Sequence, residues 1–156
     1  MTSLRTLLIA ILLGGLAAST LDVGAASLIS GKPPGFILQV IASGLLGKAS
    51  YAGGTGTMVL GMVLQWLMGL IIAAIYVLAS VRFQVPIRRW LPCGLAYGVV
   101  VYFVMTYAVV PLSAASGHHM PRFHLDSFLA NMVAMLVFGV IVAGAARWRL
   151  GAMERV

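Results

Sequence analysis

Asp22 is the residue whose type and position best suit it to chemistry, because it is the only acid inside a long apolar run, from about Leu4 to Leu28. A carboxylate at the centre of a membrane costs roughly 2.5–3.5 kcal/mol on insertion scales, and such residues often serve proton or cation movement. Counted from Leu7 at 1.5 Å per residue, Asp22 lies about 22 Å into the layer, in its outer third. The alternative is an interfacial Asp satisfied by water, Lys32 or backbone donors.

Asp22 also belongs to a stripe of mostly small residues that repeats every four positions: Ala10, Gly14, Ala18, Asp22 and Ala26. Small side chains let membrane helices approach closely, so this face should look into a bundle or toward a partner. Gly94 with Gly98, and Gly139 with Ala143, form two further small pairs. We expect these pairs to mark helix–helix contacts, within the chain or between copies.

Gln65 and Asn131 are the other strongly polar residues inside predicted membrane spans. Amides in such positions usually make interhelical hydrogen bonds worth about 1 kcal/mol. The alternative is that both line a substrate path together with Asp22. The sequence therefore nominates Asp22, Gln65 and Asn131 as one candidate proton, cation or substrate site.

The three histidines fall in one short connection, where His118, His119 and His124 lie close in sequence to Asp126. These side chains are possible ligands of a transition metal, and histidines facing the outside could also sense acid. Adjacent histidines without ordered spacing are more typical of a solvated loop, so no metal or other cofactor is predicted. Asp126 or Ser127 can cap the helix that follows.

Motifs for catalysis are missing from the sequence: it shows no nucleophile with a nearby base, no paired carboxylates and no HExxH. The glycine-rich segment Gly53–Thr57 lacks the lysine of a phosphate-binding loop. We therefore do not expect an enzyme.

Two charge-free stretches, from Lys48 to Arg82 and from Arg89 to Arg122, indicate which structural elements hold the candidate residues in place. Each exceeds the ~20 apolar residues that a helix needs to cross a ~30 Å hydrocarbon layer. The runs are continuously apolar and longer than barrel strands, so they predict helices. The expected architecture is all-α: a single polytopic domain over residues 1–156, forming a membrane four-helix bundle with spans at about 4–28, 58–81, 91–112 and 128–146. The first run could instead be a signal peptide with Arg5 in its basic region, although its length favours a span.

The composition agrees with a membrane protein, since 62% of residues are hydrophobic and 8% are charged, against about 25% charged in soluble domains. The net charge of +7 comes from basic residues scattered between apolar runs. Anionic lipid is therefore the expected partner of these charges, and nucleic acid is not.

Basic residues predict the orientation, because they concentrate in cytoplasmic loops. Seven lie on one side of the predicted spans, and only Lys32, Lys48 and Arg122 lie on the other. We expect the first side, with both termini, to face the cytoplasm of a bacterium. The first periplasmic connection then contains a helix at about 36–50, too short to span. Gln39, Ser43, Gly47 and Ser50 share one of its faces, which favours an amphipathic interfacial helix over a re-entrant segment.

Several segments resemble a group of small bacterial inner-membrane proteins with four spans: Ile41–Gly47, Gly53-Gly54, Gly94–Met105 and Val109–Ser113. The last three spans also resemble, more distantly, the YagU-like inner-membrane family. The first resemblance implies a bacterial inner-membrane location and carries no site residues. The second would hint at acid-stress physiology.

Two functions remain open at this point. The favoured expectation is a structural or accessory membrane subunit that forms a homo-oligomer or packs into a larger complex, because abundant small residues make packing surfaces. The alternative is a small oligomeric transporter or channel that uses Asp22.

Overall fold

The computed structural model describes residues 4–83, 85–114 and 125–151, and every element within these ranges is helical. Four helical runs there are long and apolar enough to cross a membrane: α1 (Leu4–Ser30), α3 (Gly54–Phe83), the continuous run of α5 (Trp90–Val104), η2 (Met105–Val109) and α6 (Val110–Leu112), and most of α7 (Leu125–Leu150). At 1.5 Å per residue, a run of 23 residues is about 35 Å long, which exceeds the ~30 Å hydrocarbon layer. The prediction of an all-helical chain with four long apolar helices is confirmed.

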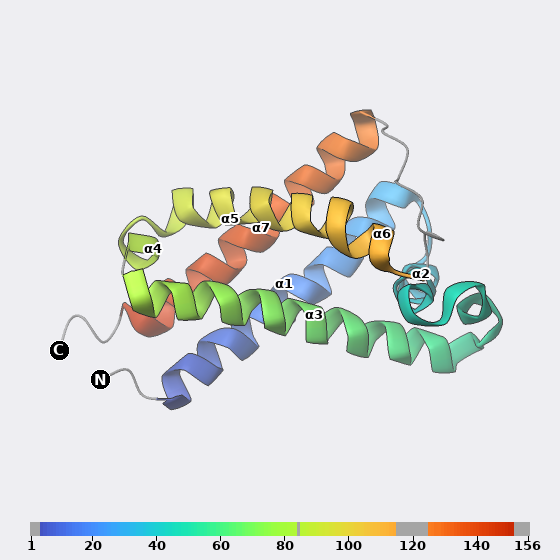
Figure 1. Cartoon of the computed structure of the whole chain (residues 1–156), viewed down its shortest axis with the longest axis horizontal. Helices are drawn as coiled ribbons and strands as arrows, with labels where there is room; N and C mark the ends of the chain where they lie inside the picture. Colours follow the sequence, from blue (N-terminus) through green and yellow to red (C-terminus); the bar gives the residue numbers. More distant parts are fainter. Residues whose placement is uncertain (1–3, 84, 115–124, 152–156) are drawn as a thin grey trace.

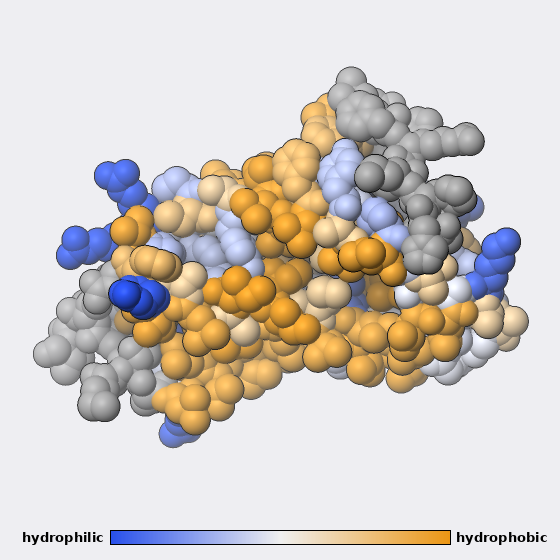
Figure 2. All heavy atoms as spheres, viewed as in Figure 1, coloured by the Kyte–Doolittle hydropathy of each residue, from blue (hydrophilic) through white to orange (hydrophobic). Residues whose placement is uncertain are grey.

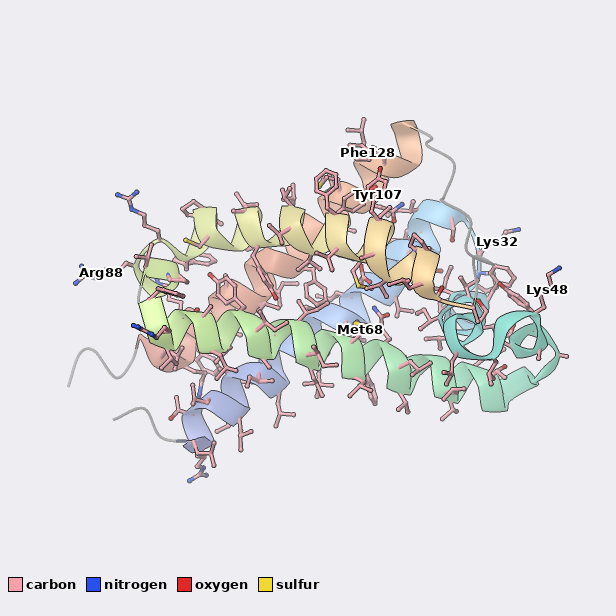
Figure 3. The ribbon with its side chains drawn as sticks, in the orientation of Figure 1. Lys32, Lys48, Met68, Arg88, Tyr107 and Phe128 are labelled. Carbon is pink, nitrogen blue, oxygen red and sulfur yellow. The ribbon has the colours of Figure 1, made fainter. Side chains whose placement is uncertain are left out.

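The long helices alternate in direction, so α1 begins and α7 ends at the same end of the molecule (Figure 1). The described arginines all lie at this end, which we call the arginine end: Arg5, Arg82, Arg88, Arg89, Arg147 and Arg149. Lys32 and Lys48 lie at the opposite end, the lysine end, as Figure 3 shows with Arg88 for comparison. Between the two ends, the visible surface is mainly apolar (Figure 2).

Glycines set the closest helix contacts. α1 packs against α3 and α7, and α5 packs against α7. A Cβ atom added to Gly15 of α1 would lie 3.0 Å from the Gly69 carbonyl oxygen of α3. On α5, a Cβ at Gly98 would lie 2.9 Å from the Leu136 Cα, and one on Gly139 of α7 would lie 2.8 Å from the Gly98 nitrogen. These backbones approach too closely for any side chain, as in small-residue membrane contacts.

The backbones of α3 and α5, in contrast, make few close contacts in the described part of the chain. One bridge joins them: the Tyr97 hydroxyl donates a hydrogen bond of 2.7 Å to the Ile72 carbonyl oxygen. The Tyr76 ring lies beside the Tyr97 ring, with 5.1 Å between centroids. We call the space between these two helices the α3–α5 seam. The backbones therefore approach closely on three sides of the bundle, whereas on the fourth side the described contacts are made by side chains.

The predicted short helix is present but divided, as α2 (Pro34–Leu46) followed by the 3₁₀ helix η1 (Gly47–Ala52). Pro34 is at the first helical position, where its missing N–H costs nothing, and Gly47 ends α2 with φ +58°, which favours glycine. Ser43 and Ser50, on the face expected to be polar, are 2% and 0% exposed, whereas Leu45 is 63% exposed. The structure therefore turns this face inward, with α2 packed against α3.

η2 is a π-helix, and Pro111 explains it. Proline has no N–H for the carbonyl of Tyr107, four residues earlier, and its ring crowds that carbonyl. The Val110 N–H bonds instead to the Met105 carbonyl, which widens the turn. A short helix, α4 (Val85–Arg88), links α3 to α5 at the arginine end.

Candidate functional site

Asp22 of α1 and Gln65 of α3 meet between their helices. The Gln65 Nε2 atom donates a hydrogen bond of 2.9 Å to the Asp22 Oδ2 atom. The same nitrogen lies 3.5 Å from the Ser19 carbonyl oxygen, a longer and weaker contact. Both side chains are half-buried. One donor from a neighbouring helix thus faces the carboxylate nominated by the sequence.

The nearby Gly15–Gly69 contact explains why the two side chains meet. Asp22 follows Gly15 by seven residues, and Gln65 precedes Gly69 by four, so each lies on the same helix face as its glycine. Ser19 lies between Gly15 and Asp22 on α1 and is fully buried. Its hydroxyl donates a hydrogen bond of 2.6 Å to the Gly15 carbonyl oxygen. The close approach of the backbones at the glycines therefore brings the polar pair within hydrogen-bonding distance.

Asp22 also lines an apolar groove between α1 and α7, with a volume of about 670 Å³. We call it the α1–α7 groove. All its other lining residues are apolar: Ala18, Leu21, Ala25, Leu28 and Ile29 of α1, and Leu129, Ala130, Val133, Ala134, Val137, Phe138 and Ile141 of α7. The carboxylate is therefore the single polar side chain among the described residues of this groove.

Gln65 lines a second cavity, of about 400 Å³, at the lysine-end part of the α3–α5 seam. Its walls come from α2, α3 and the segment from η2 to Ser113, and Met68 of α3 is among them (Figure 3). The Ala114 N–H donates to the Gly44 carbonyl of α2 at 2.9 Å and holds this end together. The Asp22–Gln65 hydrogen bond therefore joins a lining residue of one cavity to a lining residue of the other.

Asn131, the third member of the nominated set, does not belong to this arrangement. It lies on α7 with its side chain exposed, and it is not a lining residue of either cavity. The structure thus brings Asp22 to Gln65 and directs Asn131 elsewhere.

The small residues nominated for packing lie at helix contacts or in the core. A Cβ on Gly14 would lie 3.2 Å from the Ala145 Cβ of α7, and one on Gly94 would lie 2.8 Å from the Ala143 Cβ. Ala18 and Ala143 are buried.

The histidine cluster lies outside the described residues. This holds for His118, His119 and His124, and the side chain of Asp126 is likewise not described. A metal site there stays a prediction.

Sequence reasoning missed the residues that surround the polar pair. The Trp66 indole N–H donates to the Thr20 hydroxyl at 3.2 Å, a second α1–α3 bond next to the Asp22–Gln65 bond. The sequence does contain a signal for this second bond. Thr20 lies two residues before Asp22 on α1, and Trp66 directly follows Gln65 on α3, so polar groups that are close together on one helix face polar groups that are close together on the other.

At the arginine end, Arg147 lies over the Trp90 ring, with 5.4 Å from its Cζ atom to the ring centroid. Such cation–π contacts place the guanidinium beside an aromatic ring of the kind that gathers at membrane surfaces.

Comparisons of the chain with protein-family models, with curated proteins and with solved structures found no match. The resemblance to small inner-membrane proteins, the YagU-like family included, therefore stays a prediction, and the function is inferred from the residues of this chain.

Proposed function

We propose that this chain is a bacterial inner-membrane transporter or channel for protons or monovalent cations, with Asp22 and Gln65 as its membrane-embedded site. The observation that carries the proposal is the Asp22–Gln65 hydrogen bond, which connects the linings of two cavities. The chain acts as a homo-oligomer, because a single four-helix bundle encloses too little space for a continuous pore.

The energetic cost of Asp22 supports a functional role. A carboxylate offers about four acceptor positions, and the hydrogen bond from Gln65 occupies one. Asp22 also lines the α1–α7 groove, where every other described lining residue is apolar and offers no side-chain donor. An ionised group left so poorly solvated is costly unless it binds a proton or a cation, and binding of this kind is the chemistry of a proton or cation carrier.

The proposed orientation places the arginine end in the cytoplasm, following the rule that basic loops stay inside. The arginines then face anionic headgroups of the inner leaflet. α2 lies near the outer surface, where its exposed leucines meet lipid and its other side, with Ser43 buried, packs against α3.

Proton flux in proteoliposomes tests the transport proposal. Purified protein is reconstituted around a trapped pH-sensitive dye, and a potassium diffusion potential drives protons inward. We expect flux with the natural sequence, none with Asp22→Asn, and partial flux with Asp22→Glu, which keeps the carboxylate. Asn131→Leu is the matched control, since Asn131 lines neither cavity. Flux that survives Asp22→Asn unchanged would overturn the proposal.

A second candidate function is that of an accessory subunit, and the cavity at the lysine-end part of the α3–α5 seam favours it. A helix from a partner could complete the fourth side of the bundle. Photo-crosslinking separates this function from transport: a crosslinker at Leu67, which lines the seam cavity, should capture a stoichiometric partner, and one at Leu12, exposed on α1 and outside the cavity, should not. Equal capture at both positions contradicts a seam-specific partner.

A further inference from the structure

The α1–α7 groove combines one carboxylate with an otherwise apolar lining, and this combination selects a ligand class. Its volume of about 670 Å³ lies within the usual range of roughly 300–1,000 Å³ for small-molecule sites. Inorganic cations need several oxygen ligands, and here Asp22 is the only polar lining residue among those described. A hydrated metal ion therefore does not suit the groove, whereas an apolar molecule with one positive charge does.

The groove also opens toward the surface that faces lipid in a membrane. Leu21 of α1 and Val133 and Val137 of α7 line it and are each more than half exposed. A ligand dissolved in the bilayer could therefore enter sideways between the two helices without crossing a polar barrier.

We propose that the α1–α7 groove binds a lipophilic organic monocation, whose apolar body packs between α1 and α7 and whose charge pairs with Asp22. The inference rests on the proposed cation-binding role of Asp22 and names its substrate class. Gln65 positions the carboxylate from the α3 side through Oδ2 and leaves the other acceptors for the ligand. Charge pairing in a low-dielectric site is strong, so loss of the carboxylate should weaken binding at least about tenfold.

Equilibrium binding of tetraphenylphosphonium to the purified full-length protein in mild detergent tests this site. Tetraphenylborate, an anion of the same shape, is the ligand control. We expect saturable binding of the cation alone, lost in Asp22→Asn and retained in Asp22→Glu. Size-exclusion chromatography of each variant verifies that it is folded.

A matched pair of substitutions tests the location. Ala25→Phe fills the groove one turn from Asp22, whereas Ala17→Phe adds the same volume on an exposed face of α1 outside the groove. We expect Ala25→Phe to abolish cation binding and Ala17→Phe to leave it unchanged. Binding that survives both Asp22→Asn and Ala25→Phe overturns the inference.

The combined results separate this inference from the proposed function. Asp22-dependent proton flux without tetraphenylphosphonium binding overturns the substrate class and leaves the transport proposal standing. Binding that depends on Asp22 and Ala25, without any flux of protons or of the cation, supports the site and overturns transport.

Discussion

Tyr97 of α5 donates its hydroxyl hydrogen to the backbone carbonyl of Ile72 on α3, over 2.7 Å. Apart from this bond and the neighbouring Tyr76–Tyr97 ring contact, the two helices make few close backbone contacts in the described residues. The Ile72 carbonyl also accepts within α3, so the tyrosine uses its second lone pair and does not break the helix. The bond therefore fixes the width of the seam at one point while leaving the seam cavity open at the lysine end.

Replacing Tyr97 with Phe should remove the hydrogen bond to the Ile72 carbonyl. Interhelical hydrogen bonds in membranes contribute about 0.6 kcal/mol on average, so we expect a loss of roughly 0.5–1 kcal/mol in unfolding free energy. Unfolding in mixed micelles followed by circular dichroism measures it. Tyr107→Phe is the control, because Tyr107 is exposed and contributes its ring to a stack on Phe103. Equal losses in both variants would show that the Tyr97 bond contributes nothing.

Gly139→Ala should drive α5 and α7 apart. The new Cβ would overlap the Gly94 carbonyl oxygen and lie 2.8 Å from the Gly98 nitrogen, and all of these are backbone atoms that cannot rotate away. Overpacking of this kind costs about 1–3 kcal/mol. The same micelle unfolding assay reports it.

Gly144→Ala is the matched control on the same helix. Its Cβ would meet only the Trp90 Cζ3 atom, at an ordinary 3.7 Å, among the described residues. Alanine is a better helix former than glycine by up to about 1 kcal/mol, so this variant should be as stable as the natural sequence or slightly more so. A Gly139→Ala protein as stable as Gly144→Ala would mean that the α5–α7 contact relaxes freely.

The long helices were predictable because lipid leaves the backbone few choices, and continuous apolar runs satisfy them only as helices. The position of Pro111 in the sequence likewise predicts a widened turn near Tyr107. The division of the short helix at Gly47 was less predictable, since glycine also occurs inside membrane helices.

The composition of the site was predictable only in part. Asp22, Gln65 and Asn131 stand out by type, but which of them meet depends on how each helix is rotated. That rotation is set by the Gly15–Gly69 contact, a tertiary feature that periodicity within one helix does not reveal. Small residues four apart indicate that a face can be approached closely, without naming the helix that approaches it.

Cysteine labelling tests the proposed orientation. In a Cys93→Ala background, Ala52→Cys introduces a thiol at the lysine end and Val85→Cys introduces one at the arginine end, both at exposed positions. An impermeant maleimide added to spheroplasts should label Ala52→Cys directly and Val85→Cys only after permeabilisation. The reverse pattern would place the arginine end outside the cell.

The Gln65→Leu variant and the double variant Asp22→Leu with Gln65→Leu together distinguish a functional pair from a structural one. Gln65→Leu leaves the Asp22 carboxylate without its described donor, and an unsatisfied buried polar group costs about 1–3 kcal/mol. Replacing both residues with Leu removes that penalty, so the double variant should be more stable than Gln65→Leu and close to the natural sequence. If the pair is purely structural, the double variant should lose neither stability nor any activity of the protein. The transport proposal predicts a stable double variant with no proton flux, because the chain retains a costly carboxylate for binding and not for folding. A double variant that keeps full flux would contradict the role assigned to Asp22.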